Sequence, residues 1–133
     1  MKISEQTVRS IFAGLEHGDG DAFFEHVADD VDWTVMGTHP LAGHYHSKRA
    51  FQEATFSKLG KVLPNGAELR VANVIVVGDM AVIELVSGAI ARNGMRFGNH
   101  YCWVTRFDGQ RIVEVRAYLD SAMVAELFRQ NPL

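Results

Sequence analysis

The first residues that could do chemistry are histidines in the segment GTHPLAGHYHSK. Half of the six histidines of the chain fall within it: His39, His44 and His46. Imidazoles two residues apart suit zinc or copper, but a metal site needs a third or fourth ligand. No carboxylate or cysteine accompanies them in the segment, so Asp32 or Glu53 could join them only through folding. We therefore expect no metal, and no cofactor of any kind.

Two carboxylates, Glu84 and Asp120, are candidates for acid or base chemistry. Glu84 lies in the middle of the apolar run MAVIELV, where a lone carboxylate needs a partner or an exposed face. An ion pair with Arg106 or Arg116 at a dimer surface is one outcome, and proton exchange inside an apolar pocket is the other. Asp120 precedes the last predicted helix, where its position predicts an N-cap, and a catalytic role is the alternative.

Alternation along the strand-like run GNHYCWVTRF places its chemical groups on two faces. Asn99, Tyr101 and Trp103 share one face, and His100 and Cys102 share the other. A phenol and an amide can hold a carbonyl or enolate oxygen, so Asn99 and Tyr101 are the first candidates for polar groups in a pocket. The alternative is that Tyr101 packs in the core and its hydroxyl finds a hydrogen-bond partner nearby. The spacing of His100 and Cys102 is weak evidence for a nucleophile.

Three bulky or charged side chains on strand-like runs are further candidates for ligand contacts. Trp33 lies on the first predicted strand, where a core aromatic and a pocket wall are overlapping interpretations. Arg116 and Tyr118 share one face of the last strand, and the opposite face is wholly apolar. The apolar face must meet either the core or a subunit interface, and the sequence leaves both open.

The periodicity of apolar residues predicts the elements that position these groups. The predicted order is helix, helix, strand, helix, four strands and helix, at 4–16, 22–27, 31–36, 47–60, 67–79, 80–94, 95–109, 110–120 and 121–130. HGDGD at 17–21 breaks the first two helices apart, and Gly60 ends the third. Gly78-Asp79, Asn93-Gly94 and Asp108-Gly109 are hairpin signals, so the last four strands form an antiparallel meander. The fold class is α+β.

Size and charge exclude several functional classes. The 133 residues suit one domain, 1–133, with a core of its own. A net charge of −3 and scattered lysines and arginines argue against nucleic acid as a partner. The chain has no apolar run long enough for a membrane span and no signal peptide at its start, and its one cysteine fits a reducing compartment. We expect a cytoplasmic protein.

Four stretches resemble the NTF2-like superfamily, and within it the SnoaL-like, ketosteroid-isomerase-related proteins. They are VADDVDWTVMG, VVGDMAVIEL, PLAGHYHSKRAF and GNHYCWVTRFDGQRIVEVRAYLDS. The resemblance covers nearly the whole chain. It implies a cone in which a curved, mostly antiparallel β-sheet wraps around N-terminal helices, with a pocket between them and commonly a homodimer through the sheet.

The resemblance also implies where catalytic carboxylates would lie. Ketosteroid isomerases carry a general base on the first strand, at the position of Thr34, and cyclases and epoxide hydrolases carry an acid on the last strand, at Ala117. Both acids are missing here, which favours a non-catalytic module. His46 stands where relatives often have glycine. His39 precedes Pro40, which favours extended backbone, and could reach the pocket mouth.

These observations predict a pocket for a small apolar, carbonyl-bearing molecule, with cofactor-independent proton transfer of the isomerase, cyclase or dehydratase type. A non-catalytic binding or dimerisation module is the alternative. The predicted catalytic groups are His39, Glu84, Tyr101 and Asp120. The predicted ligand contacts are Trp33, Asn99, Tyr101, Trp103, Arg116 and Tyr118.

Overall fold

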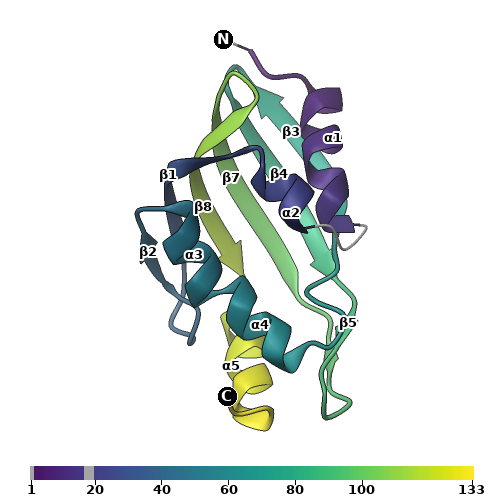
Figure 1. Ribbon diagram of the computed structural model, residues 1–133. Helices are drawn as coiled ribbons and strands as arrows, with labels where there is room; N and C mark the ends of the chain where they lie inside the picture. The colour runs from purple at the N-terminus through teal and green to yellow at the C-terminus, as the bar shows by residue number, and fades with distance from the viewer. Residues whose placement is uncertain (1, 17–19) are drawn as a thin grey trace.

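A six-stranded sheet forms the body of the protein in this computed structural model, which describes residues 2–16 and 20–133 (Figure 1). Its strand order is β2-β1-β8-β7-β4-β3, and a separate two-stranded sheet pairs β5 with β6. The strands are β1 (Val27–Val35), β2 (Gly43–Tyr45), β3 (Leu69–Val77), β4 (Met80–Ser87), β5 (Ala89–Ile90), β6 (Arg96–Phe97), β7 (His100–Asp108) and β8 (Arg111–Leu119).

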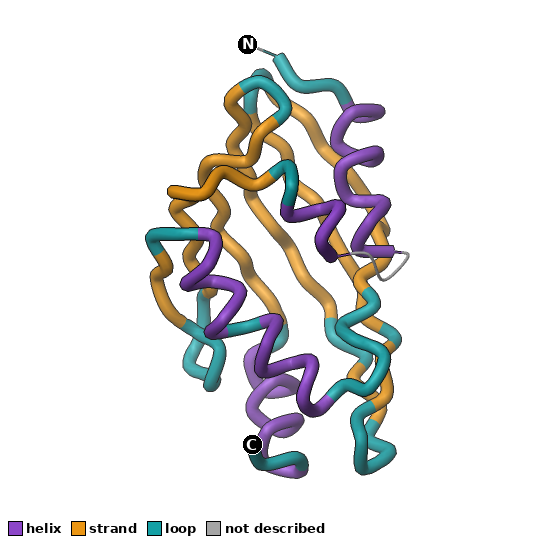
Figure 2. The backbone as a smooth tube through the Cα atoms, in the orientation of Figure 1, coloured by secondary structure: helices purple, strands orange, loops and turns teal. Residues whose placement is uncertain are grey.

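The first four helices lie on one side of this sheet and the last continues beyond the end of β8, as the tube in Figure 2 also shows. They are α1 (Glu5–Glu16), α2 (Gly20–Phe24), α3 (Lys48–Ala54), α4 (Phe56–Val62) and α5 (Ser121–Gln130). Helix α1 contacts β3, and α3 contacts β1. Of the predicted break at 17–21, residues 17–19 lie outside the described part of the chain. No described helix is long and apolar enough to cross a bilayer.

The predicted meander is confirmed. Strands β3, β4, β7 and β8 pair antiparallel with one another in that order. Gly78, Gly94 and Gly109 take positive φ values of 63°, 90° and 64° at the predicted turns, a conformation that glycine adopts without strain. The short sheet of β5 and β6 is inserted between β4 and β7. The sequence did not predict β2, nor the parallel pairing of β1 with β8.

The third predicted helix is two helices that meet at Thr55. The Thr55 hydroxyl donates a hydrogen bond of 2.7 Å to the carbonyl of Phe51, and its backbone leaves the helical region at φ −124° and ψ −76°. A threonine that bonds back to the preceding turn competes with the regular helix. Gly60, predicted to end the helix, lies inside α4 instead. The break turns the apolar sides of both helices towards the sheet.

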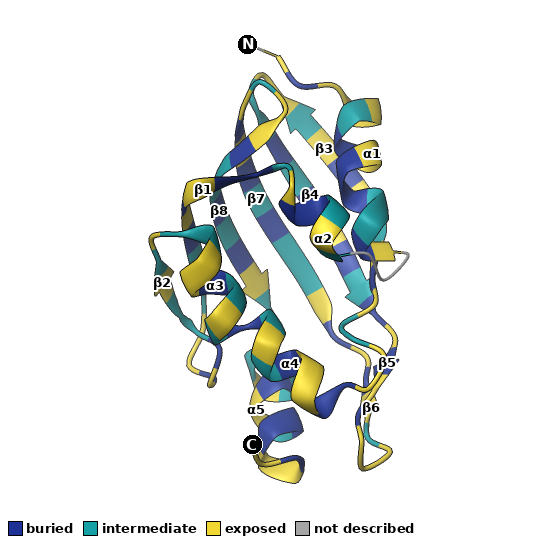
Figure 3. Ribbon diagram, in the orientation of Figure 1, coloured by how far each residue is buried: buried dark blue, intermediate teal, exposed yellow. Residues whose placement is uncertain are grey.

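Burial alternates along the strands and gives the main sheet an inner and an outer face. On β4, Ala81, Ile83 and Leu85 are buried, whereas Glu84 is exposed. Figure 3 shows buried segments in the strands behind α1 and α2, and exposed turns on the sides of α3 and α4 that face away from the sheet. The helices cover the inner face, and any pocket between sheet and helices must open there.

Candidate functional site

A cavity lies between the inner face of the sheet and the helices α3 and α4. Its interior volume is about 40 Å³, and about 400 Å³ when space open to solvent is included. The residues that line it, here called the central pocket, are Trp33, Val35, Leu41, Phe51, Thr55, Phe56, Leu59, Ala67, Leu69, Tyr101, Trp103, Ala117 and Leu119. Ligand sites are commonly apolar clefts with few polar groups, and this lining has that character.

Stacked aromatic rings build one wall of the central pocket. The rings of Trp33 and Phe51 stack with centroids 3.8 Å apart and planes 18° apart. Trp103 meets Trp33 edge-on at 5.2 Å, and Tyr101 meets Trp103 at 6.5 Å. Strand alternation explains the arrangement, because Tyr101 and Trp103 are two residues apart on β7 and Trp33 faces inward from β1. Three of the predicted ligand contacts are therefore neighbours in this wall.

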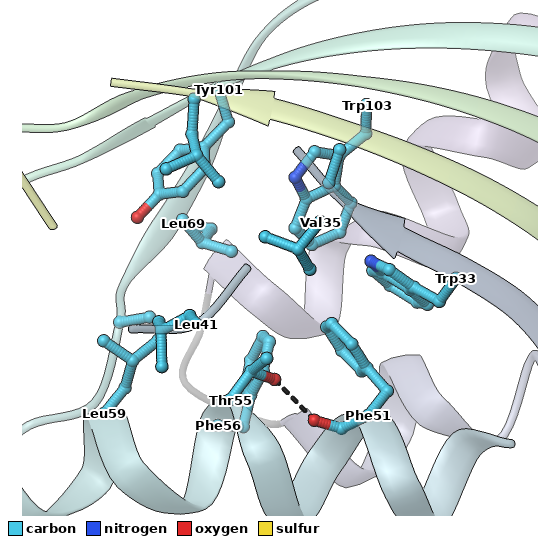
Figure 4. Close-up of a pocket in the computed structure, with 13 residues that line it drawn as sticks. Trp33, Val35, Leu41, Phe51, Thr55, Phe56, Leu59, Leu69, Tyr101 and Trp103 are labelled. Carbon is cyan, nitrogen blue, oxygen red and sulfur yellow. Dashed lines mark hydrogen bonds between the residues drawn. The ribbon is translucent and has the colours of Figure 1, made fainter. Parts of the chain in front are cut away.

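Both indole groups of this wall have an unused hydrogen-bond donor. Trp33 Nε1 and Trp103 Nε1 are buried and have no hydrogen-bond partner among the described residues. In Figure 4 the two nitrogens lie on the sides of the rings that face the middle of the pocket. A buried donor without an acceptor costs about 1–3 kcal/mol.

Tyr101 adds a third donor to the central pocket. Burial raises the pKa of the Tyr101 phenol well above its usual range, and the neighbouring Asn99 amide acts in the opposite direction. The phenol therefore stays protonated at neutral pH and acts as a donor, not as a base. The Thr55 hydroxyl already donates to the Phe51 carbonyl (Figure 4), so it is engaged within the helices.

The lining residues of the central pocket include no carboxylate, histidine, lysine, arginine or cysteine. Ala117, at the position where the resemblance implied an acid, contributes only a methyl group to the wall. Thr34, at the other implied position, alternates away from Trp33 and Val35 and is half-buried outside the pocket. The described pocket can offer hydrogen-bond donors to a ligand, but it holds no group that titrates near neutral pH.

Three predicted residues lie on the outer face of the sheet, and this corrects their assignment to the pocket. Glu84 is exposed on β4 and accepts a hydrogen bond of 3.1 Å from Asn73 Nδ2. Arg116 pairs with Glu114 at 3.1 Å, and Tyr118 is 44% exposed. On β8 the inward positions belong to Ala117 and Leu119, because side chains alternate and the apolar face of that strand meets the core.

Asp120 and Asn99 hold the junction between β8 and α5. Asp120 Oδ1 accepts a hydrogen bond of 3.1 Å from the backbone N–H of Met123, so it is the N-cap of α5 and lies outside the pocket. Asn99 is fully buried, and its Oδ1 accepts from the backbone N–H groups of His100 and Asp120 at 2.8 and 3.2 Å. Asn99 is not a lining residue; it positions the start of β7, which carries Tyr101.

His39 is buried in the loop that joins β1 to β2 and does not line the pocket. Its Nε2 lies 3.0 Å from the Met36 carbonyl, and its Nδ1 lies 3.2 Å from the backbone N–H of Leu41. These partners assign the proton to Nε2. Gly37 packs on the same imidazole with φ of 113°. The ring fixes the loop that presents Leu41 to the pocket, and both of its nitrogens are engaged.

Acid should destabilise the protein through His39. Burial lowers the pKa of His39 below its usual range, and the hydrogen bond to the Met36 carbonyl opposes that shift. The unfolded chain therefore binds more protons between the folded pKa and about 6.5, and stability falls as pH drops through that window. Unfolding by denaturant at pH 7.5 and 5.5 should show a smaller pH dependence for His39→Gln than for the parent.

The exposed His100 provides the control for this comparison. His100→Gln should keep the pH dependence of the parent. If His39→Gln loses as much stability on acidification as the parent does, His39 is not the group that couples folding to pH.

Sequence reasoning missed ten lining residues of the central pocket. Some could have been found, because Val35 follows Trp33 by two residues and the helical face of Phe51, Thr55 and Leu59 is visible in the sequence. The others depend on long-range packing. They are Leu41, Phe56, Ala67, Leu69, Ala117 and Leu119.

Comparison with known proteins gives relatives of moderate similarity. Residues 8–115 match the family described as the SnoaL-like domain. The chain is 24% identical over 135 residues to the dimerizing cyclase phiC of a Fungal sp. (strain ATCC 74256), covering 98% of this chain and 59% of that protein. It is 25% identical over 136 residues to the dimerizing cyclase tstC of Talaromyces stipitatus, covering 98% and 60%. The chain thus spans about three fifths of the length of these curated relatives.

Among solved structures, the chain is similar to an NTF2-like protein of Burkholderia thailandensis E264. The two share 25% identity and a TM-score of 0.79, covering 92% of this chain and 95% of that chain. The two chains therefore share their overall fold.

Proposed function

This chain belongs to the SnoaL-like domain family of the NTF2-like superfamily, and from that membership we propose that its central pocket binds a small apolar molecule through an oxygen atom that accepts hydrogen bonds. One observation carries the proposal: the indole N–H groups of Trp33 and Trp103 are buried at the pocket without an acceptor. The Tyr101 hydroxyl supports it as a third donor. A carbonyl oxygen, which has two lone pairs and no proton, can accept hydrogen bonds from two of these three donors at once.

The apolar lining supports binding over proton transfer. Proton transfer needs an acid or base whose pKa lies near the working pH, and the described lining residues supply none. We therefore place ligand binding first, and the residues proposed to contact the ligand are Trp33, Tyr101 and Trp103.

A second candidate function is a cyclase-type reaction. Donors directed at one oxygen can stabilise the negative charge that develops on an enolate, as an oxyanion site does. The two curated relatives are named dimerizing cyclases, which favours this reaction class. In this case Tyr101, Trp33 and Trp103 would hold the oxygen, and the base would be solvent or a group of the substrate.

A matched pair of probes tests the binding proposal. We expect 1-tetralone, an aromatic ketone, to bind more tightly than tetralin, its hydrocarbon analogue, as measured by quenching of tryptophan fluorescence or by calorimetry. Tyr101→Phe should weaken 1-tetralone binding about tenfold and leave tetralin binding unchanged, because only the ketone loses a hydrogen bond. Equal affinity for both probes would reject the proposed donors.

The same ketone separates binding from catalysis. 1-Tetralone has exchangeable protons beside its carbonyl, so NMR in D₂O reports whether the protein accelerates their exchange. Binding without acceleration is the result we expect from a pocket that lacks an acid or base. Acceleration that Tyr101→Phe removes would establish the cyclase-type alternative.

We further propose a homodimer of a one-domain chain, formed through the outer face of the sheet. The described helices cover only the inner face (Figure 2), and the outer face carries half-buried Val82, Val86 and Val104 beside exposed Ile75 and Tyr118. An uncovered face with this many apolar side chains is a frequent interaction site.

Size-exclusion chromatography with light scattering should give twice the 14.8 kDa mass of the chain. Val104→Arg should shift the mass to that of a monomer, because it places a charge in the centre of the outer face. Ile90→Arg, at an exposed site on β5, is the control and should stay dimeric. A monomeric parent would refute the proposed dimer.

A further inference from the structure

Three potential metal ligands meet on the edge of the main sheet, outside the central pocket. Asp32 on β1, His44 on β2 and His46 just after β2 each offer one ligand atom, and these atoms lie within 4.8 Å of one another. All three side chains are exposed. His44 and His46 are close on their own, with ring centroids 4.3 Å apart.

Strand pairing brings these residues together. β1 and β2 pair antiparallel with Thr34 opposite His44 and Trp33 opposite Tyr45. His44 and His46 are two residues apart, so both project to the face opposite Tyr45, and Asp32 projects to that same face from β1. This is the third ligand that the segment GTHPLAGHYHSK lacks in the sequence. His44 Nε2 and Asp32 Oδ1 already contact each other across the two strands.

The surrounding charges leave the Asp32 carboxylate available. Glu114 lies beside Asp32 on β8, but it is paired with Arg106 at 3.0 Å and with Arg116 at 3.1 Å. Arg106 and Arg116 are therefore both engaged by Glu114. Asp32 therefore makes its ion-pair contact with His44 alone among the described residues.

We propose that Asp32, His44 and His46 bind Zn²⁺, with solvent in the fourth position. Two imidazole nitrogens and one carboxylate oxygen are ligands that zinc prefers, and three protein ligands leave one position of a tetrahedral site open. The cation would replace the contact between His44 Nε2 and Asp32 Oδ1. Nothing in this site depends on the ligand of the central pocket.

The cation would fasten β2 to β1. β2 has only three residues and lies at the edge of the sheet, so few backbone hydrogen bonds hold it. Its Tyr45 faces inward and packs against Phe51, a wall residue of the central pocket. A zinc bridge between the strands would therefore stiffen the part of the pocket wall that includes Trp33.

Titration of the tag-free full chain with ZnCl₂ in a calorimeter tests this site. We expect one Zn²⁺ per chain, and a loss of at least tenfold in affinity for His44→Asn, His46→Asn or Asp32→Asn, because each removes one of three ligands. Co²⁺ in place of Zn²⁺ should give the visible absorption of a tetrahedral complex. His100→Asn, at an exposed histidine on β7, is the control and should bind as the parent does.

Circular dichroism of the three ligand variants without metal checks that they remain folded. Failure of the parent to bind Zn²⁺ would reject the site, and would establish the His44–Asp32 contact as an ordinary hydrogen bond. An equal loss of affinity in His100→Asn and in the ligand variants would also reject it, because it indicates scattered surface binding.

Discussion

Replacing Trp33 with alanine is expected to lower the free energy of unfolding by about 3–5 kcal/mol. Trp33 is fully buried, stacks on Phe51 at 3.8 Å and packs edge-on against Trp103 at 5.2 Å. The substitution removes that contact area and leaves a hole between the sheet and α3. Denaturant unfolding followed by circular dichroism measures the loss.

Trp33→Phe separates the packing role of the side chain from its donor role. Phenylalanine keeps most of the apolar area and removes an N–H group that has no acceptor, so the two effects offset each other and the stability loss should stay below about 1.5 kcal/mol. Tyr118→Ala, at an exposed aromatic of the outer face, is the control for truncation. A loss for Trp33→Ala as small as that for Tyr118→Ala would contradict the packing described for this wall.

Ala117→Phe is expected to weaken binding of 1-tetralone more than 100-fold. Ala117 lies opposite Trp103 on β7 and opposite Val35 on β1, and both neighbours line the central pocket. A benzyl side chain at this position fills the space that a ligand needs. Fluorescence titration with the same probe measures the change.

Overpacking alone costs about 1–3 kcal/mol, so unfolding of Ala117→Phe is measured beside binding. If the benzyl group of Ala117→Phe disturbs the fold, Ala117→Leu fills less of the central pocket and should weaken binding of 1-tetralone to a smaller extent. Ala72→Phe places the same side chain at an exposed alanine of β3 and should bind as the parent does. Unchanged affinity in a folded Ala117→Phe protein would show that ligands bind elsewhere.

Local sequence signals predicted most of the fold. The Ser4 hydroxyl accepts a hydrogen bond of 3.1 Å from the Thr7 backbone N–H and Asp120 caps α5, as their positions before apolar helical periods indicated. The glycines at 78, 94 and 109 marked the turns of the meander. These caps and turns depend only on residues that are neighbours in sequence. The resemblance to the NTF2-like fold rests on the order of the helices and strands along the chain, and it is confirmed.

Features that depend on distant contacts escaped prediction. β2 is only three residues long and is recognisable as a strand only beside β1. The break between α3 and α4 lies at Thr55, whose hydroxyl donates a hydrogen bond to the Phe51 carbonyl. The periodicity of apolar residues gives no sign of this hydrogen bond. Glu84 was predicted as a catalytic group and Arg116 as a ligand contact, but alternation gives only relative faces and does not say which face is the inner one. The apolar face of β8, and not its polar face, turned out to be the inner one.

The candidate site also has a part that the sequence predicted and a part that it did not. Trp33 was predicted as the bulky aromatic of the first strand, Tyr101 as a phenol that could hold an oxygen, and Trp103 as a residue on the same face as Tyr101. The sequence did not indicate that both indole donors would be buried without acceptors, because that depends on what every neighbouring element places near them. The proposal for the pocket depends on these two unpaired indole N–H groups.

The NMR signals of the two indole N–H groups test that proposal most directly. Trp33 and Trp103 are the only tryptophans in the chain, so a ¹⁵N-labelled sample gives two indole signals, and Trp33→Phe and Trp103→Phe assign them. We predict that 1-tetralone moves both proton signals downfield as its carbonyl accepts their hydrogen bonds, and that tetralin does not. Saturating 1-tetralone binding that leaves both indole signals in place would contradict the account.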